Sequence, residues 1–325
     1  MSKIDIDKEF IERFEAGLNA RHPDKSALPA TVLGYGEMST VLAIQDKRAE
    51  HLAFKRMPMF HSRREVEDYE EILYESLGVL RTKIGVQVAP TGTTWLEDKN
   101  NGLITIYIAQ PKLAADSICN SLIAHLPAHE VKALVRRVLA ETHKVFDYNA
   151  KHRGETEIGF DAQISNWAVA DYRPGMPFVD GEFNLLYIDI SSPLMRTDGK
   201  ERLDSELFLR SAPSFLRWLI RLLFVQDVIN RYYDQRKVTI DLLANFYKEQ
   251  RADLIPAMID VVNEFYADAL TDEKFAMIHL KEVKSYYRED AMIWRIYLAA
   301  RKIDRFLHRL FGKRYPYMLP DKIKR

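Results

Sequence analysis

The sequence predicts an α+β fold with two lobes, a small lobe built on an antiparallel β-sheet and a larger lobe built mainly of helices. Before about residue 110, apolar runs of strand length alternate with turns, and one long amphipathic helix lies among them. Beyond that point, apolar residues recur at helical spacing over 128–149 and over most of 205–310. The expected lobes are 1–110 and 111–325, with a linker at 109–113 that contains Gln110, Pro111 and Lys112.

The small lobe is expected to hold five strands and one principal helix. A short amphipathic helix comes first, because Phe10, Phe14 and Leu18 would share one face. Asn101-Gly102 is a tight-turn signal and predicts a hairpin. In chain order, we expect a helix at 5–20, three strands between 31 and 57, a helix at 63–81, and strands at 86–95 and 102–109.

In the large lobe, a strongly periodic helix over 128–149 comes first. Two short strands are expected at 166–170 and 185–190, on either side of a loop rich in proline and glycine. The most apolar run, 215–225, is too short to span a bilayer and is interrupted by two arginines, Arg217 and Arg221.

Composition and charge narrow the classes of protein and partner. The chain has 325 residues, enough for two cores, and 47% of them are apolar. Lys plus Arg and Asp plus Glu both number 47, so net charge gives no global reason to expect nucleic acid or an anionic membrane as the main partner. The single cysteine, Cys119, excludes an intrachain disulfide, and the N-terminus lacks an apolar signal segment. A cytoplasmic location is therefore expected.

A glycine-containing turn between two strands is the first candidate for a ligand-binding element. Residues 33–41 read Leu-Gly-Tyr-Gly-Glu-Met-Ser-Thr-Val. Glycine at positions 34 and 36 permits positive φ and lets backbone N–H groups approach phosphate oxygens. The hydroxyl of Ser39 can donate to a phosphate, and Val41 begins the next strand. Taken alone, these residues also fit the alternative of an ordinary β-turn with no ligand.

Lys55 stands at the end of an apolar strand, fourteen residues after Val41. A lysine among apolar residues is costly to bury unless it is paired, and the alternative is an edge-strand lysine whose ammonium reaches solvent. Ala53 points to the same strand face and leaves room for a flat ligand. We expect Glu70 to pair with Lys55 because it shares a helix face with two leucines. The competing carboxylates on that helix are those of Glu67, Glu71 and Glu75.

Three polar residues after the long helix form the third candidate group. Asp161 and Asn166 are five apart, directly after the helix and before a short strand. Asp189 ends the apolar strand Leu-Leu-Tyr-Ile, 23 residues beyond Asn166. A carboxylate that leaves a buried strand needs a partner, and Mg²⁺ is a natural one because it prefers oxygen ligands.

In this order, the pieces resemble the protein-kinase-like superfamily, and most of all its branch of aminoglycoside phosphotransferases and choline kinases. The resemblance covers roughly residues 30–195 and is specific only as an ordered set. It implies ATP between the lobes, with Lys55 on the phosphates and Ala53 beside adenine. It also implies Asp161 as catalytic base, and Asn166 and Asp189 as ligands of Mg²⁺.

The function expected from this resemblance is Mg-ATP-dependent transfer of phosphate to a hydroxyl of a small polar molecule. The sequence departs from the family in having Gly159 two residues before Asp161, where a histidine is usual, and in lacking a glycine after Asp189. No Ala-Pro-Glu segment follows, which argues against a protein substrate. Two alternatives stay open: a pseudokinase that binds nucleotide or a partner without turnover, and a kinase-fold enzyme that transfers AMP.

Overall fold

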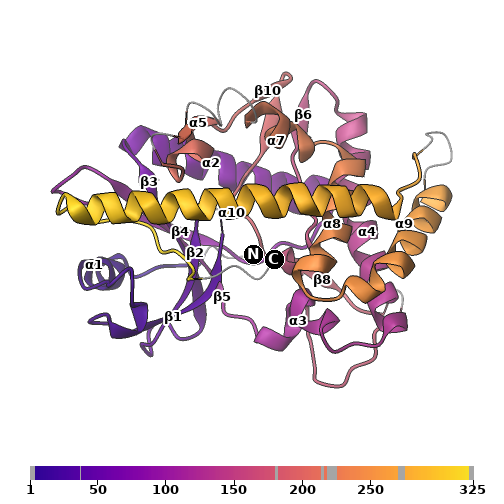
Figure 1. Cartoon of the computed structure of the whole chain (residues 1–325), viewed down its shortest axis with the longest axis horizontal. Helices are drawn as coiled ribbons and strands as arrows, with labels where there is room; N and C mark the ends of the chain where they lie inside the picture. The colour runs from indigo at the N-terminus through magenta and orange to yellow at the C-terminus, as the bar shows by residue number, and fades with distance from the viewer. Residues whose placement is uncertain are drawn as a thin grey trace.

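The computed structural model of the chain describes residues 4–36, 38–179, 182–213, 216–217, 225–269 and 275–321 (Figure 1). It confirms an α+β fold with an antiparallel sheet near the N-terminus and helices over most of the remainder. Glu37 of the glycine turn, Arg221 and most of the apolar run 215–225 lie outside the described residues.

The N-terminal part carries the main sheet, and its central strand explains where Lys55 lies. The strand order is β1-β2-β3-β5-β4, and every neighbouring pair is antiparallel. Within β3, Lys55 is paired with Val41 of β2 and with Ile108 of β5, while Ala53 is opposite Gln110. The elements of this part are α1 (Lys8–Ala16), η1 (Pro23–Lys25), β1 (Ala30–Tyr35), β2 (Thr40–Ile44), β3 (Leu52–Phe60), α2 (Arg63–Val79), the π-helical turn η2 (Leu80–Ile84), β4 (Gly92–Glu97) and β5 (Ile104–Pro111).

The remaining part is mainly helical, with two small sheets that were only partly predicted. The two strands expected at 166–170 and 185–190 are present in shorter form as β7 and β8, and they pair antiparallel. The sheet β10-β9-β6 was not predicted. The elements are η3 (Ala115–Ser117), α3 (Cys119–Ile123), α4 (Ala128–Lys151), β6 (Thr156–Ile158), η4 (Ile164–Asn166), β7 (Trp167–Val169), β8 (Leu185–Tyr187), β9 (Met195–Thr197), β10 (Lys200–Glu201), α5 (Glu206–Arg210), α7 (Val225–Arg231), α8 (Gln235–Lys248), η5 (Ala252–Leu254), α9 (Ile255–Ala269) and α10 (Leu280–Leu310).

Alternation along β3 and β5 divides the core of the sheet between two faces. On one face, Phe54 and Tyr107 pack in a cluster with Phe10 and Phe14 of α1. The opposite face belongs to a larger cluster that includes α2 and continues into α4, α8 and α9. Because side chains alternate along a strand, Lys55 points to this second side and toward the helical part.

Two predicted boundaries were wrong. The expected strand 86–95 begins only at Gly92, because Pro90 interrupts it and Val88 instead forms an isolated bridge with Tyr187. The first residues of the expected linker, including Gln110 and Pro111, belong to β5, since they pair with Ala53 and Leu52.

The long helix α10 leads the C-terminal segment of the chain back to the N-terminal sheet. Figure 1 shows α10 running along the longest axis of the molecule, from the helices α8 and α9 toward the sheet. The segment that follows packs on the sheet: Met318 joins the cluster around Phe54, and Arg56 donates to the carbonyl oxygen of Pro316 at 2.7 Å. The C-terminal segment is therefore in contact with the N-terminal sheet.

The helices of the described residues were compared with what a membrane span requires. None of their helices combines the length and the apolar character needed to cross a bilayer.

Candidate functional site

One cavity of about 560 Å³ brings together nearly all the residues singled out from the sequence. Its walls come from β1, β2, β3 and β5 on the sheet side and from the ends of β7 and β8, α8 and α10 on the helical side. Of the ten predicted site residues, nine line it and Glu70 does not. The nine are Gly34, Gly36, Ser39, Val41, Ala53, Lys55, Asp161, Asn166 and Asp189.

The glycine turn lies at the edge of this cavity, between β1 and β2. The N–H of Gly36 donates to the carbonyl oxygen of Ser39 at 2.9 Å, which closes the turn. A Cβ on Gly36 would lie only 2.9 Å from Oγ of Ser39. Neither Gly34 nor Gly36 has positive φ, so the turn does not use the conformational freedom that glycine permits. What the turn requires from Gly36 is close approach to Ser39.

Lys55 is the buried cation of the site, and its side chain is 11% exposed. Its ammonium donates to Oδ1 of Asp189 at 2.7 Å and to the carbonyl oxygen of Ile188 at 3.1 Å. The pair joins the centre of the sheet to the end of β8, two segments more than a hundred residues apart in the sequence. Burial of the lysine is thus compensated by a carboxylate, as a buried charge requires.

The expected pairing of Lys55 with Glu70 was wrong, because Asp189 holds the lysine instead. On α2 the fully buried positions near Glu70 belong to Val66, Tyr69 and Leu73, while Glu70 remains partly exposed. The hydroxyl of Tyr69 donates to the carbonyl oxygen of Ser191 at 3.0 Å. An aromatic side chain therefore takes the inward position that we had expected for a carboxylate.

Asp161 and Asn166 are held by a tight local network before β7. The side-chain amide of Asn166 donates to the carbonyl oxygen of Asp161 at 3.2 Å, and the hydroxyl of Tyr187 donates to the same oxygen at 3.1 Å. Oδ1 of Asp161 accepts from the N–H of Gln163 at 3.0 Å. The N–H of Ile188 donates to the carbonyl oxygen of Asn166 at 2.9 Å, next to the β7–β8 pair. This backbone hydrogen bond places Asn166 beside Asp189.

The two aspartates of the cavity have pKa values shifted in opposite directions. Burial raises the pKa of Asp161 to about 8, and the negative charges of Asp241 and Asp189 add to the rise. Burial also acts to raise the pKa of Asp189, but the Lys55 ammonium and hydrogen bonds from Lys55 and Ser191 outweigh it and hold that pKa below its usual range. Two carboxyl groups whose pKa values are shifted apart suit different roles: Asp161 that of a proton acceptor, and Asp189 that of a permanent anion.

The wall supplied by α8 was missed by sequence reasoning. Gln163 connects it to the site: its amide donates to Asp241 at 3.0 Å and its carbonyl oxygen accepts from Asn245 at 3.0 Å. Lys248, whose ammonium lies 3.4 Å from the same oxygen, also lines the cavity. The spacing of Asp241, Asn245 and Lys248 places them on one helix face. A polar stripe on an otherwise apolar helix was the signal that could have revealed it.

At the sheet end of the cavity, Gln110 is a polar side chain among apolar neighbours. It is 7% exposed, and its side-chain nitrogen has no hydrogen-bond partner among the described residues. Pro111, the next residue, has no N–H to offer a ligand. A planar ligand at this end would therefore find the Gln110 amide as the nearest unused polar group of β5.

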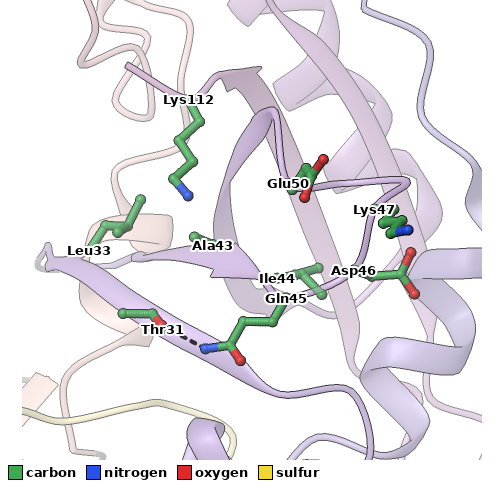
Figure 2. Close-up of a pocket in the computed structure, with 9 residues that line it drawn as sticks. All are labelled: Thr31, Leu33, Ala43, Ile44, Gln45, Asp46, Lys47, Glu50 and Lys112. Atoms are coloured by element: carbon green, nitrogen blue, oxygen red, sulfur yellow. Dashed lines mark hydrogen bonds between the residues drawn. The ribbon is translucent and has the colours of Figure 1, made fainter. Parts of the chain in front are cut away.

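A second hollow, of about 510 Å³, lies at the outer edge of the sheet (Figure 2). Figure 2 shows Thr31 and Gln45 joined by a hydrogen bond of 3.2 Å across its floor. Two acidic and two basic side chains surround it, those of Asp46, Glu50, Lys47 and Lys112. None of the predicted catalytic or metal-ligating residues lies here, so the larger cavity is the candidate site.

Comparison with known proteins places the chain in a family. The model of a family of unknown function, DUF6206, matches residues 17–305. The chain belongs to this family. The matched range contains all ten predicted site residues and the α8 wall. None of the curated proteins matches the sequence.

Proposed function

We propose that this protein is a Mg-ATP-dependent phosphotransferase that acts on a hydroxyl of a small polar molecule, within a two-lobed protein-kinase-like fold. The observation that supports it best is the meeting, in one cavity, of four segments widely separated in the sequence. These are the glycine turn, Lys55, the Asp161–Asn166 segment and Asp189. The Lys55–Asp189 pair ties the sheet side of this cavity to its helical side.

ATP fits the arrangement of charge and apolar surface along the cavity. Val41, Ala53, Leu113 and Ile188 supply apolar lining for a base, and Gln110 supplies a polar group at that end. The Lys55 ammonium suits the phosphates because it supplies a positive charge, and the glycine turn suits them because its backbone can approach a ligand closely. The adenine end would lie against β5, and the γ-phosphate would lie toward Asp161.

The residues present also fit Mg²⁺. Oδ1 of Asp189 accepts from Lys55 and Ser191, and no described residue donates to its Oδ2. The amide nitrogen of Asn166 is engaged by Asp161, and its oxygen has only the distant hydroxyl of Ser165, 3.5 Å away. Carboxylate and amide oxygens are ligands that Mg²⁺ prefers, and the bound ion would neutralise phosphate charge. Among the described residues no cluster of three or more His, Cys, Asp or Glu offers a separate metal site.

Asp161 is the residue that we assign to the acceptor. As a carboxylate, it would orient the attacking hydroxyl and take its proton as the oxygen bonds to the γ-phosphorus and the bond to ADP breaks. Its raised pKa favours proton acceptance in the range of neutral to mildly alkaline pH. Gln163, Lys248 and Asp241 would lie beside the acceptor and provide polar contacts for a small polar molecule.

The test is release of ADP from Mg-ATP in a screen of aminoglycosides, amino alcohols and sugars. Asp189→Asn should abolish the acceptor-dependent release, because it removes the carboxylate charge with little change in side-chain shape. It also leaves the buried Lys55 without its counter-charge, so circular dichroism must first show that the variant is folded. Release of pyrophosphate instead of ADP would identify AMP transfer. Equal release by wild type and Asp189→Asn would contradict the proposal.

A second candidate is a nucleotide-binding protein without turnover. One observation favours it: Lys55 is bound by the proposed metal ligand Asp189 and not by a carboxylate of α2. Nucleotide binding with no acceptor-dependent turnover across the screen would make this the better description.

A further inference from the structure

The most exposed apolar surface among the described residues lies along α10, away from the cavity. Six of its side chains follow each other at intervals of four and three residues, which places them in one line on the helix. Phe306 is 64% exposed and Leu310 is 66% exposed, although both are large apolar side chains. The line consists of Met292, Ile296, Ala299, Ile303, Phe306 and Leu310, and Ile293, Leu307 and Phe311 widen it.

The buried face of the same helix explains why this line is left outside. Val283, Ala291, Leu298 and Ala300 are the apolar residues of α10 that pack inward. The helix therefore has two apolar sides, and the described residues cover only one of them. A continuous apolar strip of this length on a monomer marks an interaction surface.

A row of basic residues accompanies the strip. Arg288, Arg295, Lys302 and Arg309 are seven residues apart, so they stay on one side of the apolar line through three heptads. Three of them are exposed, and Lys302 is half-buried and reaches the carbonyl oxygen of Asp321. The chain is neutral as a whole, but this edge of α10 is strongly basic.

A second copy of the chain would not satisfy this row. In a parallel pair of α10 helices, the basic row of one copy would face the positions of Ile293, Ala300 and Leu307 of the other. In an antiparallel pair, the basic row would face itself and repel. Neither arrangement places negative charge opposite the row.

We propose that α10 binds the surface of an anionic membrane, with the apolar strip inserted among the lipid chains and the basic row at the headgroups. An exposed helix with large apolar residues on one side and Lys and Arg beside them has the character of an interfacial helix. Figure 1 shows that α10 lies along the longest axis of the molecule, so the strip runs in the direction in which the molecule is longest. The proposal is independent of phosphate transfer.

The experiment is co-sedimentation of the full-length protein with vesicles. Vesicles containing about 30% phosphatidylserine in phosphatidylcholine should bind the protein much more tightly than phosphatidylcholine alone, since each Lys or Arg near an anionic surface is worth about a fivefold change in affinity. Salt at about 1 M should weaken binding, because it shortens the screening length from about 10 Å to about 3 Å. Equal binding to both kinds of vesicle would overturn the proposal.

Variants separate the two components of the surface. Phe306→Ser with Leu310→Ser should reduce binding at least about tenfold, since both side chains lose apolar contact with the lipid. Arg288→Gln with Arg309→Gln should reduce it about 25-fold and remove most of the preference for phosphatidylserine. Val179→Ser changes a comparably exposed residue outside α10 (47% exposed) and should bind like the wild type.

The oligomeric state tests the alternative that a second copy of the chain covers the strip. Light scattering after gel filtration should give the same mass for wild type and for the Phe306→Ser, Leu310→Ser variant. A protein that ignores all vesicles but forms a dimer, which this variant dissociates, would show that the strip is covered by a second copy. That result would overturn the membrane proposal.

Discussion

Asp161 illustrates how a single residue can be unfavourable for stability and suited to a reaction. Its carboxyl is close to Asp241 and Asp189 in a region of low water access, and its pKa is raised to about 8. A raised carboxyl pKa means that the folded protein binds a proton more tightly than the unfolded chain does. Stability is lost progressively as the pH rises from about 4 to about 8, because over this range the unfolded chain releases the proton that the folded protein retains.

This dependence can be measured directly in the metal-free protein. Asp161→Asn should raise the free energy of unfolding at pH 8 by at least about 1 kcal/mol relative to wild type, since it removes the buried repulsion with its neighbours. The difference should vanish below about pH 3, where the carboxyl is protonated in both the folded and the unfolded wild type. Urea unfolding in the presence of a chelator at several pH values provides the measurement. A pH-independent difference would show that the carboxyl of Asp161 is not perturbed.

The same substitution has the opposite consequence for phosphate transfer. Asp161→Asn should retain nucleotide binding and reduce transfer to a confirmed acceptor about 10²–10⁴-fold, the range for loss of general-base catalysis. The matched control is Asp147→Asn on α4, whose exposed carboxylate pairs with Lys151 and lies outside the cavity lining. Steady-state rates at saturating Mg-ATP make the comparison. Unchanged transfer by Asp161→Asn would remove Asp161 from the reaction.

At the scale of elements, a buried ion pair joins α1, β3 and the C-terminal segment. The guanidinium of Arg56 binds both oxygens of Glu15 at 2.6 and 2.7 Å, and it also donates to Pro316. The hydroxyl of Tyr107 donates to the same carboxylate at 2.5 Å. Burial acts to raise the pKa of Glu15, but the charge and hydrogen bonds of Arg56 outweigh it, so the pKa is lowered.

Removing the acid should therefore be costly. Glu15→Gln leaves Arg56, which is 3% exposed, without its counter-charge, and we expect a loss of about 3–5 kcal/mol in the free energy of unfolding at pH 7. Because the Glu15 pKa is lowered, the pair stabilises the protein above about pH 4.5 and the benefit is lost as the pH falls through the folded-state pKa. Chemical denaturation at pH 7 and pH 3 tests both points. Asp147→Asn, on the exposed pair with Lys151, should cost at most about 0.5 kcal/mol.

Most elements of the fold could be predicted from the sequence because their signals are local. The alternation in β1–β3, the period of α4 and the turn at Gly102 are carried by neighbouring residues. The return of 313–320 to the sheet could not be predicted, because Arg56 and Pro316 meet only through the packing of the whole chain. The sheet of β6, β9 and β10 was missed because strands of two or three residues carry almost no pattern.

For the whole molecule, the ordered motifs predicted which residues line the cavity better than they predicted which of those residues contact each other. Nine residues from separate segments line one cavity, because the order of elements fixes which strand ends meet. The predicted partner of Lys55 was wrong. A rotation of α2 by one residue decides whether Glu70 or Tyr69 points inward, and the sequence pattern does not fix that rotation. The contribution of Asp241 and Lys248 was missed because it depends on how α8 packs against the segment that holds Asp161 and Gln163.

The cavity between the sheet and the helical part leads to a prediction for the molecule as a unit. A ligand that contacts both sides stabilises the folded state by an amount set by its concentration relative to Kd, about 2.7 kcal/mol at a hundredfold excess. Millimolar Mg-ATP should therefore raise the melting temperature of the wild type. Lys55→Ala should lose most of this increase, because it removes the positive charge at the centre of the cavity.

The control must keep the number of lysines removed the same. Lys112→Ala takes away a lysine at the outer hollow of Figure 2, outside the lining of the larger cavity, and should keep the full increase with nucleotide. Comparing melting temperatures with and without Mg-ATP for the three proteins separates phosphate contact from general charge attraction. Equal losses in Lys55→Ala and Lys112→Ala would point to unspecific attraction. If Mg-ATP does not raise the melting temperature of the wild type, the proposed nucleotide site is wrong, because a ligand that binds the folded protein stabilises it.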